Sequence, residues 1–66
     1  MSQQTDSVEQ LVWQASSGDV EAQYALGIAL LEGTGVDANL EKAVEWLKVA
    51  AAGGHVKAAT LLETFG

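Results

Sequence analysis

The sequence predicts an all-α fold in which antiparallel helix pairs pack side by side, with about four helices in total. Composition supports this class, because hydrophobic residues make up 48% of the 66 residues and proline is absent. Alanine and leucine are prominent, and they favour helices over strands. Apolar residues also recur at helical spacing in segments divided by glycine-rich turns. The pattern repeats after 36 residues, a period typical of stacked helix pairs.

The first predicted helix spans residues 7–17 and follows an N-terminal stretch, residues 1–6, that we expect to be frayed or disordered. Ser7 is expected to be its N-cap, because Gln10 stands three residues later and completes a capping box. Trp13 lies off the hydrophobic stripe of this helix. Since an exposed tryptophan often anchors an interface, it is a candidate protein-binding residue, with plain surface exposure as the alternative.

The second predicted helix spans residues 19–32 and is apolar almost all round. Asp19 is expected to cap it. A helix of this kind is either buried on several sides or has one side that faces a partner. Gly27 in its interior lowers helix stability by up to about 1 kcal/mol relative to alanine, which indicates that a neighbouring helix passes close to it. Gly33 and Gly35 then end the helix in a tight turn.

Two further helices are predicted over residues 39–53 and 55–65. Asn39 caps the first of them, which carries a clear hydrophobic stripe at helical spacing. A glycine pair breaks the chain between the two helices. His55 occupies the position that the capping aspartate holds one repeat earlier. We therefore expect it to satisfy helix-end N–H groups in solvent.

One segment carries a recognisable set of motifs, which read Ala22-x-x-x-Leu26-Gly27, Gly33-x-Gly35-Val36, Lys42-Ala43-x-x-Trp46-Leu47 and Ala50-Ala51-x-x-Gly54. This set closely resembles the Sel1-like repeat, a relative of the tetratricopeptide repeat. The resemblance covers one full unit, at about residues 20–54, and a half-repeat on each side. Gln10 departs from it, since the repeat places an aromatic residue there, equivalent to Trp46. Glu63 also departs from it, because it stands where the next unit would carry the equivalent of Gly27.

The resemblance implies a short Sel1-like and tetratricopeptide-like α-solenoid whose first helices line a concave, protein-binding face. Carried over by register, the structural positions are Ala22, Leu26, Gly27, Gly33, Gly35, Ala43, Trp46, Leu47, Ala51 and Gly54. The concave positions are Glu21, Tyr24, Ile28, Leu31 and Glu32 on the second helix, with Lys57, Thr60 and Thr64 on the fourth. For Tyr24, Ile28 and Leu31, the alternative is packing within the chain.

Charge and residue content argue against several function classes. Nine acidic residues against three basic ones give a formal net charge of −6, which disfavours direct nucleic-acid binding and anionic membrane surfaces. Cysteine is absent and histidine occurs once, so we expect no metal site, no cofactor and no catalytic nucleophile–base pair. The chain is therefore predicted not to be an enzyme. No signal peptide or membrane-spanning run is recognisable, and a cytoplasmic protein is the expectation.

Two functional hypotheses remain open. The first is a small adaptor or regulator that binds a protein segment, or a second copy of itself, through an apolar groove. Fewer than two repeats leave apolar faces uncovered, which favours self-association, most simply as a twofold dimer. The alternatives are a chain that folds fully only on a partner and a monomer of marginal stability. The second hypothesis is an acidic inhibitor that masks a basic or nucleic-acid-binding surface of a target protein. Salt separates the two, because only the charge mimic should lose affinity steeply as salt rises.

Overall fold

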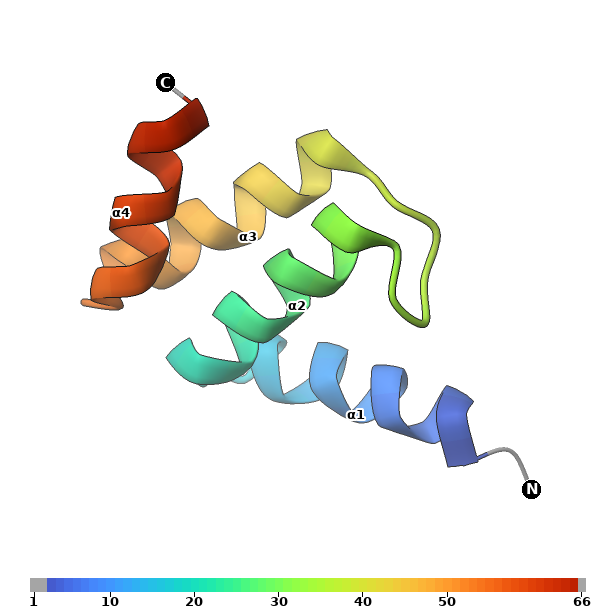
Figure 1. The fold of residues 1–66 in the computed structure, drawn as a ribbon. Coiled ribbons are helices and arrows are strands. Elements are labelled where there is room, and N and C mark those ends of the chain that lie inside the picture. Colours follow the sequence, from blue (N-terminus) through green and yellow to red (C-terminus); the bar gives the residue numbers. More distant parts are fainter. Residues whose placement is uncertain (1–2, 66) are drawn as a thin grey trace.

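The computed structural model describes residues 3–65, with side chains from residue 9 onward. These residues form four helices, α1 (Gln3–Ser16), α2 (Val20–Glu32), α3 (Leu40–Ala52) and α4 (Val56–Phe65). The first three run in alternating directions, with α2 packed against both α1 and α3, and α4 packs on α3 (Figure 1). The predicted all-α class is confirmed. Among the described helices, none combines the length and the apolar character that a membrane span requires.

The start of α1 differs from the prediction. The helix begins at Gln3, so Ser7 lies inside it and is not its N-cap. Residues 3–6 are helical, although the sequence predicts a frayed stretch there. The physical reason is that glutamine is a good helix former, and neither proline nor glycine interrupts this stretch. Residues 1–2 lie outside the described part of the chain.

The other three helices lie where they are predicted, with their caps just outside the helical ranges. Asp19 Oδ1 accepts a hydrogen bond from the backbone N–H of Ala22 at 3.1 Å. Asn39 Oδ1 accepts one from the backbone N–H of Lys42 at 3.0 Å. Each bond satisfies a donor that has no partner within its own helix. Both predicted caps are therefore confirmed.

The 36-residue repeat is visible in the backbone of the turns before α2 and α4. Gly18 has a φ of 100° and Gly54 a φ of 97°, a left-handed conformation that glycine adopts without steric cost. In each turn the residue after the glycine donates its backbone N–H to the carbonyl five residues earlier, at 3.1 Å in the first turn and 3.0 Å in the second. The same geometry thus recurs at equivalent positions of the repeat.

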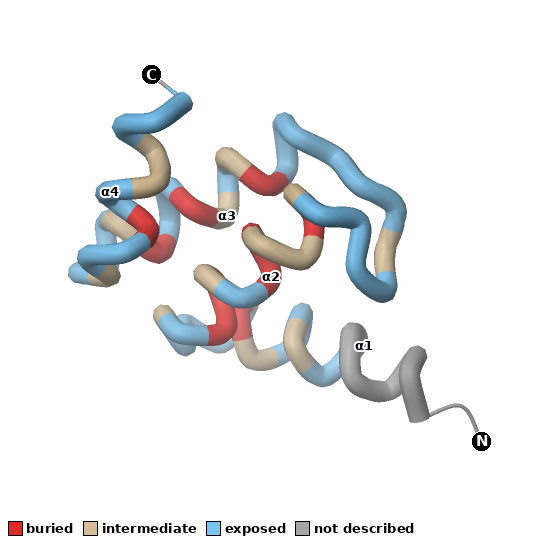
Figure 2. Tube along the Cα trace, in the orientation of Figure 1, coloured by how far each residue is buried: buried red, intermediate tan, exposed pale blue. Residues whose placement is uncertain are grey.

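Small side chains and a few leucines form the core. Buried residues face each other between α1, α2 and α3 and again between α3 and α4 (Figure 2). They are Ala15, Ala22, Leu26, Leu30, Ala43, Leu47, Ala50 and Ala58. At Gly27, an added Cβ would lie 2.8 Å from both Cγ and Cδ2 of Leu47. The close passage of a neighbouring helix, predicted from this glycine, is confirmed.

Gln23 is a buried polar residue that ties α1 to α2. It is 6% exposed, and its Nε2 donates a hydrogen bond to the Ala15 carbonyl at 3.0 Å. This bond holds the end of α1 against the first turns of α2. Sequence reasoning missed it, because glutamine is usually an exposed residue. The repeat gave no signal either, since the counterpart of Gln23 is Ala59, whose side chain has no polar group.

Candidate protein-binding site

Four residues predicted for the concave face line one open depression of about 290 Å³ between α2 and α4: Tyr24, Lys57, Thr60 and Thr64. The rest of its lining is Val56 and Leu61. The spacing of the α4 residues places them on one helical face. A second depression, of about 370 Å³, shares Tyr24 and extends past it to Glu21 and His55. We call the two depressions together the α2–α4 groove.

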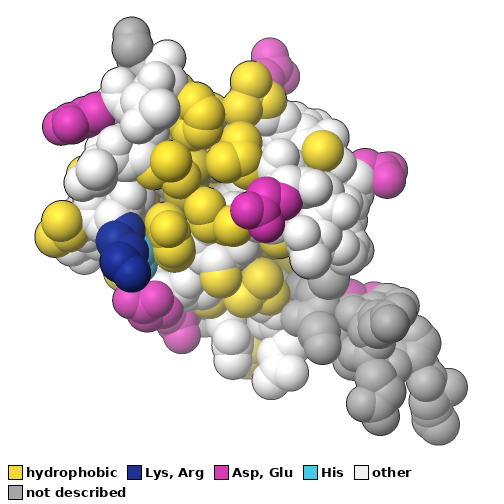
Figure 3. Space-filling model, in the orientation of Figure 1, with side chains coloured by type: hydrophobic (Ala, Val, Ile, Leu, Met, Phe, Trp, Pro, Cys, Tyr) yellow, Lys and Arg dark blue, Asp and Glu magenta, His cyan; other side chains and the backbone are white. Residues whose placement is uncertain are grey.

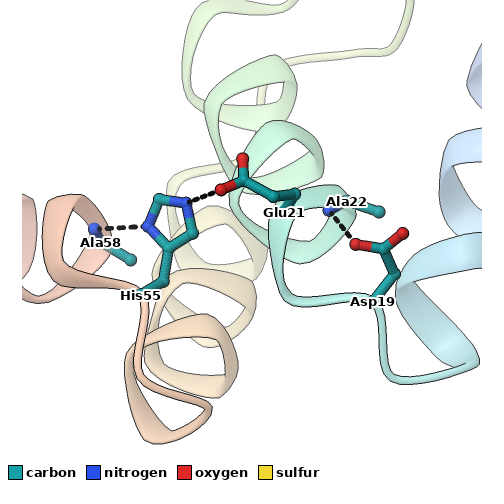
Figure 4. A network of polar contacts seen from close by, with 5 residues as sticks. All are labelled: Asp19, Glu21, Ala22, His55 and Ala58. Atoms are coloured by element: carbon teal, nitrogen blue, oxygen red, sulfur yellow. Dashed lines mark hydrogen bonds and ion pairs between the residues drawn. The ribbon is translucent and has the colours of Figure 1, made fainter.

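His55 forms the floor of this groove. Its ring stacks on that of Tyr24, with ring centroids 4.3 Å apart and an interplanar angle of 16°. Figure 4 shows the two polar contacts of the ring: Nδ1 accepts the backbone N–H of Ala58 at 3.2 Å, and Nε2 lies 3.2 Å from Glu21 Oε2. A ring nitrogen accepts only when it carries no proton. The neutral ring therefore bears its hydrogen on Nε2 and donates it to the Glu21 carboxylate.

The predicted capping role of His55 is confirmed, but its predicted position in solvent is wrong. The side chain of His55 is 8% exposed, because the Tyr24 ring covers it, whereas that of Glu21 is 84% exposed. A contact with so exposed a carboxylate adds little stability. Its effect is to orient the ring and to link α2 to the start of α4. The capping role could be predicted from the register of the repeat. The stacking of His55 on Tyr24 could not, because it joins residues far apart in the sequence.

The cap can be tested separately from the stack. His55→Ala is expected to lower the free energy of unfolding by about 1 kcal/mol more than His55→Asn. Both variants lose the stack on Tyr24, but only asparagine can still accept the N–H of Ala58. Urea unfolding followed by circular dichroism measures the difference. Asp19→Ala, at the cap of α2, is the matched control and should show a loss of similar size; equal stability of the two His55 variants would contradict the capping role.

Other residues predicted for protein binding do not line the α2–α4 groove. Ile28 and Leu31 are both half-buried. Leu31 packs against the buried cluster of α1, α2 and α3, so for this residue the alternative of packing within the chain holds. Glu32 is exposed at the end of α2. A band of hydrophobic side chains covers the face of α2, α3 and α4 that Figure 3 shows. Trp13 is 73% exposed on α1, and its role at an interface stays a prediction.

The positions that the resemblance assigns to structure form the frame behind the groove. Buried among them are Ala22, Leu26, Gly27, Ala43 and Leu47. Half-buried and packed against the core are Trp46 and Ala51. Positive φ angles occur in the turns at Gly33, Gly35 and Gly54. The frame therefore holds α2 and α4 in fixed relation, so that residues from the two helices can act on one ligand.

The helices form pairs that repeat with a common register, and a groove lies between the first helices of successive pairs. This arrangement defines a helical-repeat protein of the α-solenoid type. The family follows from the comparison of residues 20–55, which match the model of the Sel1 repeat. Because this match covers more than half of the sequence, the chain belongs to the Sel1 repeat family. No solved structure matches the chain significantly. The matched range agrees with the full unit predicted at about residues 20–54.

The lining of the groove combines apolar and polar side chains. It offers a stacked aromatic pair, apolar side chains, two threonine hydroxyls, one lysine and the exposed carboxylate of Glu21. No carboxylate among the described side chains lies within 4 Å of the Lys57 ammonium. In the same part of the chain, no group of three or more histidines, cysteines or acids is placed to hold a metal ion. Sel1 repeats are typically non-catalytic and serve in protein interactions.

Proposed function

We propose that this protein is an interaction module that binds a short segment of a partner protein in the α2–α4 groove. The observation that carries the proposal is the convergence of Tyr24 from α2 with Lys57 and Thr60 from α4 on one open depression. The membership in the Sel1 repeat family supports the general role, since such repeats generally bind proteins.

The lining indicates what the bound segment offers. Tyr24 and Leu61 provide apolar surface for a hydrophobic side chain. The Lys57 ammonium, which has no carboxylate of the described side chains within 4 Å, suits an acidic group on the segment. Thr60 and Thr64 can donate to or accept from a peptide backbone. We therefore infer a segment that carries one apolar anchor and a nearby Asp, Glu or C-terminal carboxylate.

A selection from a displayed library of random peptides tests this function. We expect the wild-type protein to enrich peptides with an apolar residue near an acidic one. Lys57→Glu should weaken the selected peptides by at least about tenfold, because it turns an attraction into a repulsion. Thr60→Arg should weaken them as well, since a long side chain then occupies the depression. Thr60 is exposed, so this variant keeps the fold.

Thr34→Arg, in the turn between α2 and α3, is the matched control and should leave affinity unchanged. Enriched peptides that are basic, that lose affinity steeply with salt and that ignore Thr60→Arg would contradict the groove. They would instead favour the acidic inhibitor, for which the net charge of −6 is the attraction. Failure to enrich any peptide that responds to these variants would also count against the proposal.

A further inference from the structure

A second groove, between α3 and α4, shares no lining residue with the α2–α4 groove. It has a volume of about 460 Å³, and its lining is Leu40, Val44, Lys48, Leu62 and Phe65. Leu40 is 59% exposed and Phe65 is 42% exposed. A contiguous apolar surface of this kind marks an interaction site more often than scattered apolar residues do. We call this surface the α3–α4 groove.

The repeat explains why the α3–α4 groove is open. Leu62 occupies the position that Leu26 holds one repeat earlier. Leu26 is 2% exposed, because α3 packs on α2, whereas Leu62 remains half-buried at the edge of the described residues. The groove is thus the place where a solenoid would receive its next helix. Any occupant must offer an apolar helical face to Leu62 and to the exposed side of α3.

From the charges on α3 we propose that the occupant is a second copy of this chain, related to the first by a twofold axis. Along the exposed side of α3, Leu40 and Val44 are accompanied by Glu41 near the N-terminal end of the helix and by Lys48 on the other side of Val44, while Glu45 lies directly beside Val44. When two such helices lie antiparallel with their Val44 residues near the axis, Lys48 of each copy faces Glu41 of the other. The surface is therefore complementary to itself, as a twofold interface requires.

The surroundings of the Lys48 ammonium within one copy support this arrangement. No carboxylate of the described side chains lies within 4 Å of its ammonium, although two glutamates stand on the same helix. A second copy would supply the missing partner twice, once on each side of the axis. It would also cover Leu40 and Phe65 with apolar groups of the opposite copy.

Helix α1 of a second copy, in a head-to-tail stack, fits the same groove less well. In such a stack, α1 of the next copy would lie where a further helix of the solenoid would pack, but α1 has no Lys or Arg to face the acids there. Glu63 also stands where α2 has Gly27, at which an added Cβ would lie 2.8 Å from Leu47. A bulky acid at this point opposes the close helix passage that stacking in the repeat register needs. The twofold arrangement avoids this passage and closes after two copies.

Light scattering after size-exclusion chromatography, over a wide range of protein concentrations, tests the proposal. We expect a dimer that dissociates on dilution. Leu40→Asp should raise its dissociation constant by at least about tenfold, because it places a charge in the apolar contact. Lys48→Glu and Glu41→Lys should each weaken the dimer about tenfold as well, since each turns two attractions into two repulsions. The double variant Glu41→Lys/Lys48→Glu should restore association to within about threefold of wild type.

Lys42→Glu is the control for charge alone and should have no more than a small effect. A wild-type mass that stays monomeric at every concentration would overturn the proposal. So would a dimer that ignores Leu40→Asp, or one that dissociates with Trp13→Ala, because the contact would then lie elsewhere. Circular dichroism of each variant confirms that the helices are intact. The inference does not rest on the proposed function, since Leu40→Asp leaves the α2–α4 groove untouched and peptide binding can be measured in the same variant.

Discussion

Leu47→Ala is expected to lower the free energy of unfolding by about 2–5 kcal/mol. Leu47 is the largest side chain among the described residues that is completely buried, and it joins α3 to α2. Alanine loses the apolar contacts and leaves a cavity, which the surrounding small residues are poorly able to fill. A core in a chain of this size rarely supplies more than about 3–5 kcal/mol. The variant should therefore be substantially unfolded at room temperature.

Far-UV circular dichroism and urea unfolding measure this effect. Val49→Ala lies on the same helix, but Val49 is 46% exposed, so its substitution should cost less than about 1 kcal/mol. The difference between the two variants separates core packing from the helix propensity of α3. Similar urea midpoints for the two would contradict a core organised around the contact of α2 with α3.

Gly27→Ala is expected to destabilise the protein by about 1–2 kcal/mol, although alanine is the better helix former. The gain in helix propensity is about 1 kcal/mol. It is outweighed because the added Cβ would lie 2.8 Å from Cγ and Cδ2 of Leu47 and 3.3 Å from the backbone oxygen of Ala43. The Cγ atom and the backbone oxygen cannot move aside without shifting α3. Ala25→Gly, at an exposed site of the same helix, is the control that measures the effect of helix propensity without a change in core packing.

The two substitutions should be strongly coupled. In the Leu47→Ala background the methyl of Gly27→Ala no longer meets Cγ and Cδ2 of Leu47, and only the contact of 3.3 Å with the backbone oxygen of Ala43 remains. The same change is therefore expected to lose most of its cost and to raise stability by up to about 1 kcal/mol. Urea unfolding in a stabilising osmolyte keeps all four proteins of the cycle measurable. Additive effects would show that Gly27 is not held by the approach of Leu47.

The parts of the fold that the sequence predicted well depend on local chemistry and on the repeat. Asp19 and Asn39 cap their helices because a short polar side chain directly before an apolar helix can accept an N–H group of its first turn. Gly18 and Gly54 adopt nearly the same φ because they occupy one position of one repeat. The start of α1 was missed, since a polar stretch without proline or glycine gives no local stop signal.

The site was predictable only in part. Tyr24, Lys57 and Thr60 do converge, because the register of the repeat fixes which faces of α2 and α4 meet. Leu31 was assigned to the same face, yet it packs against the core. A helix that is apolar almost all round has no periodicity to show which side is covered. His55 was missed as a groove residue for another reason: its burial depends on the Tyr24 ring, which is distant in the sequence.

Binding of a peptide in the α2–α4 groove can be mapped by amide chemical shifts in a ¹H–¹⁵N NMR titration of the protein with a peptide selected by the wild type. We expect the largest changes on the facing sides of α2 and α4, at Tyr24, His55, Lys57 and Thr60. The indole signal of Trp13, on the exposed side of α1, should stay in place. Changes concentrated at Trp13 and the rest of α1, with the α2–α4 groove unaffected, would contradict binding in this groove.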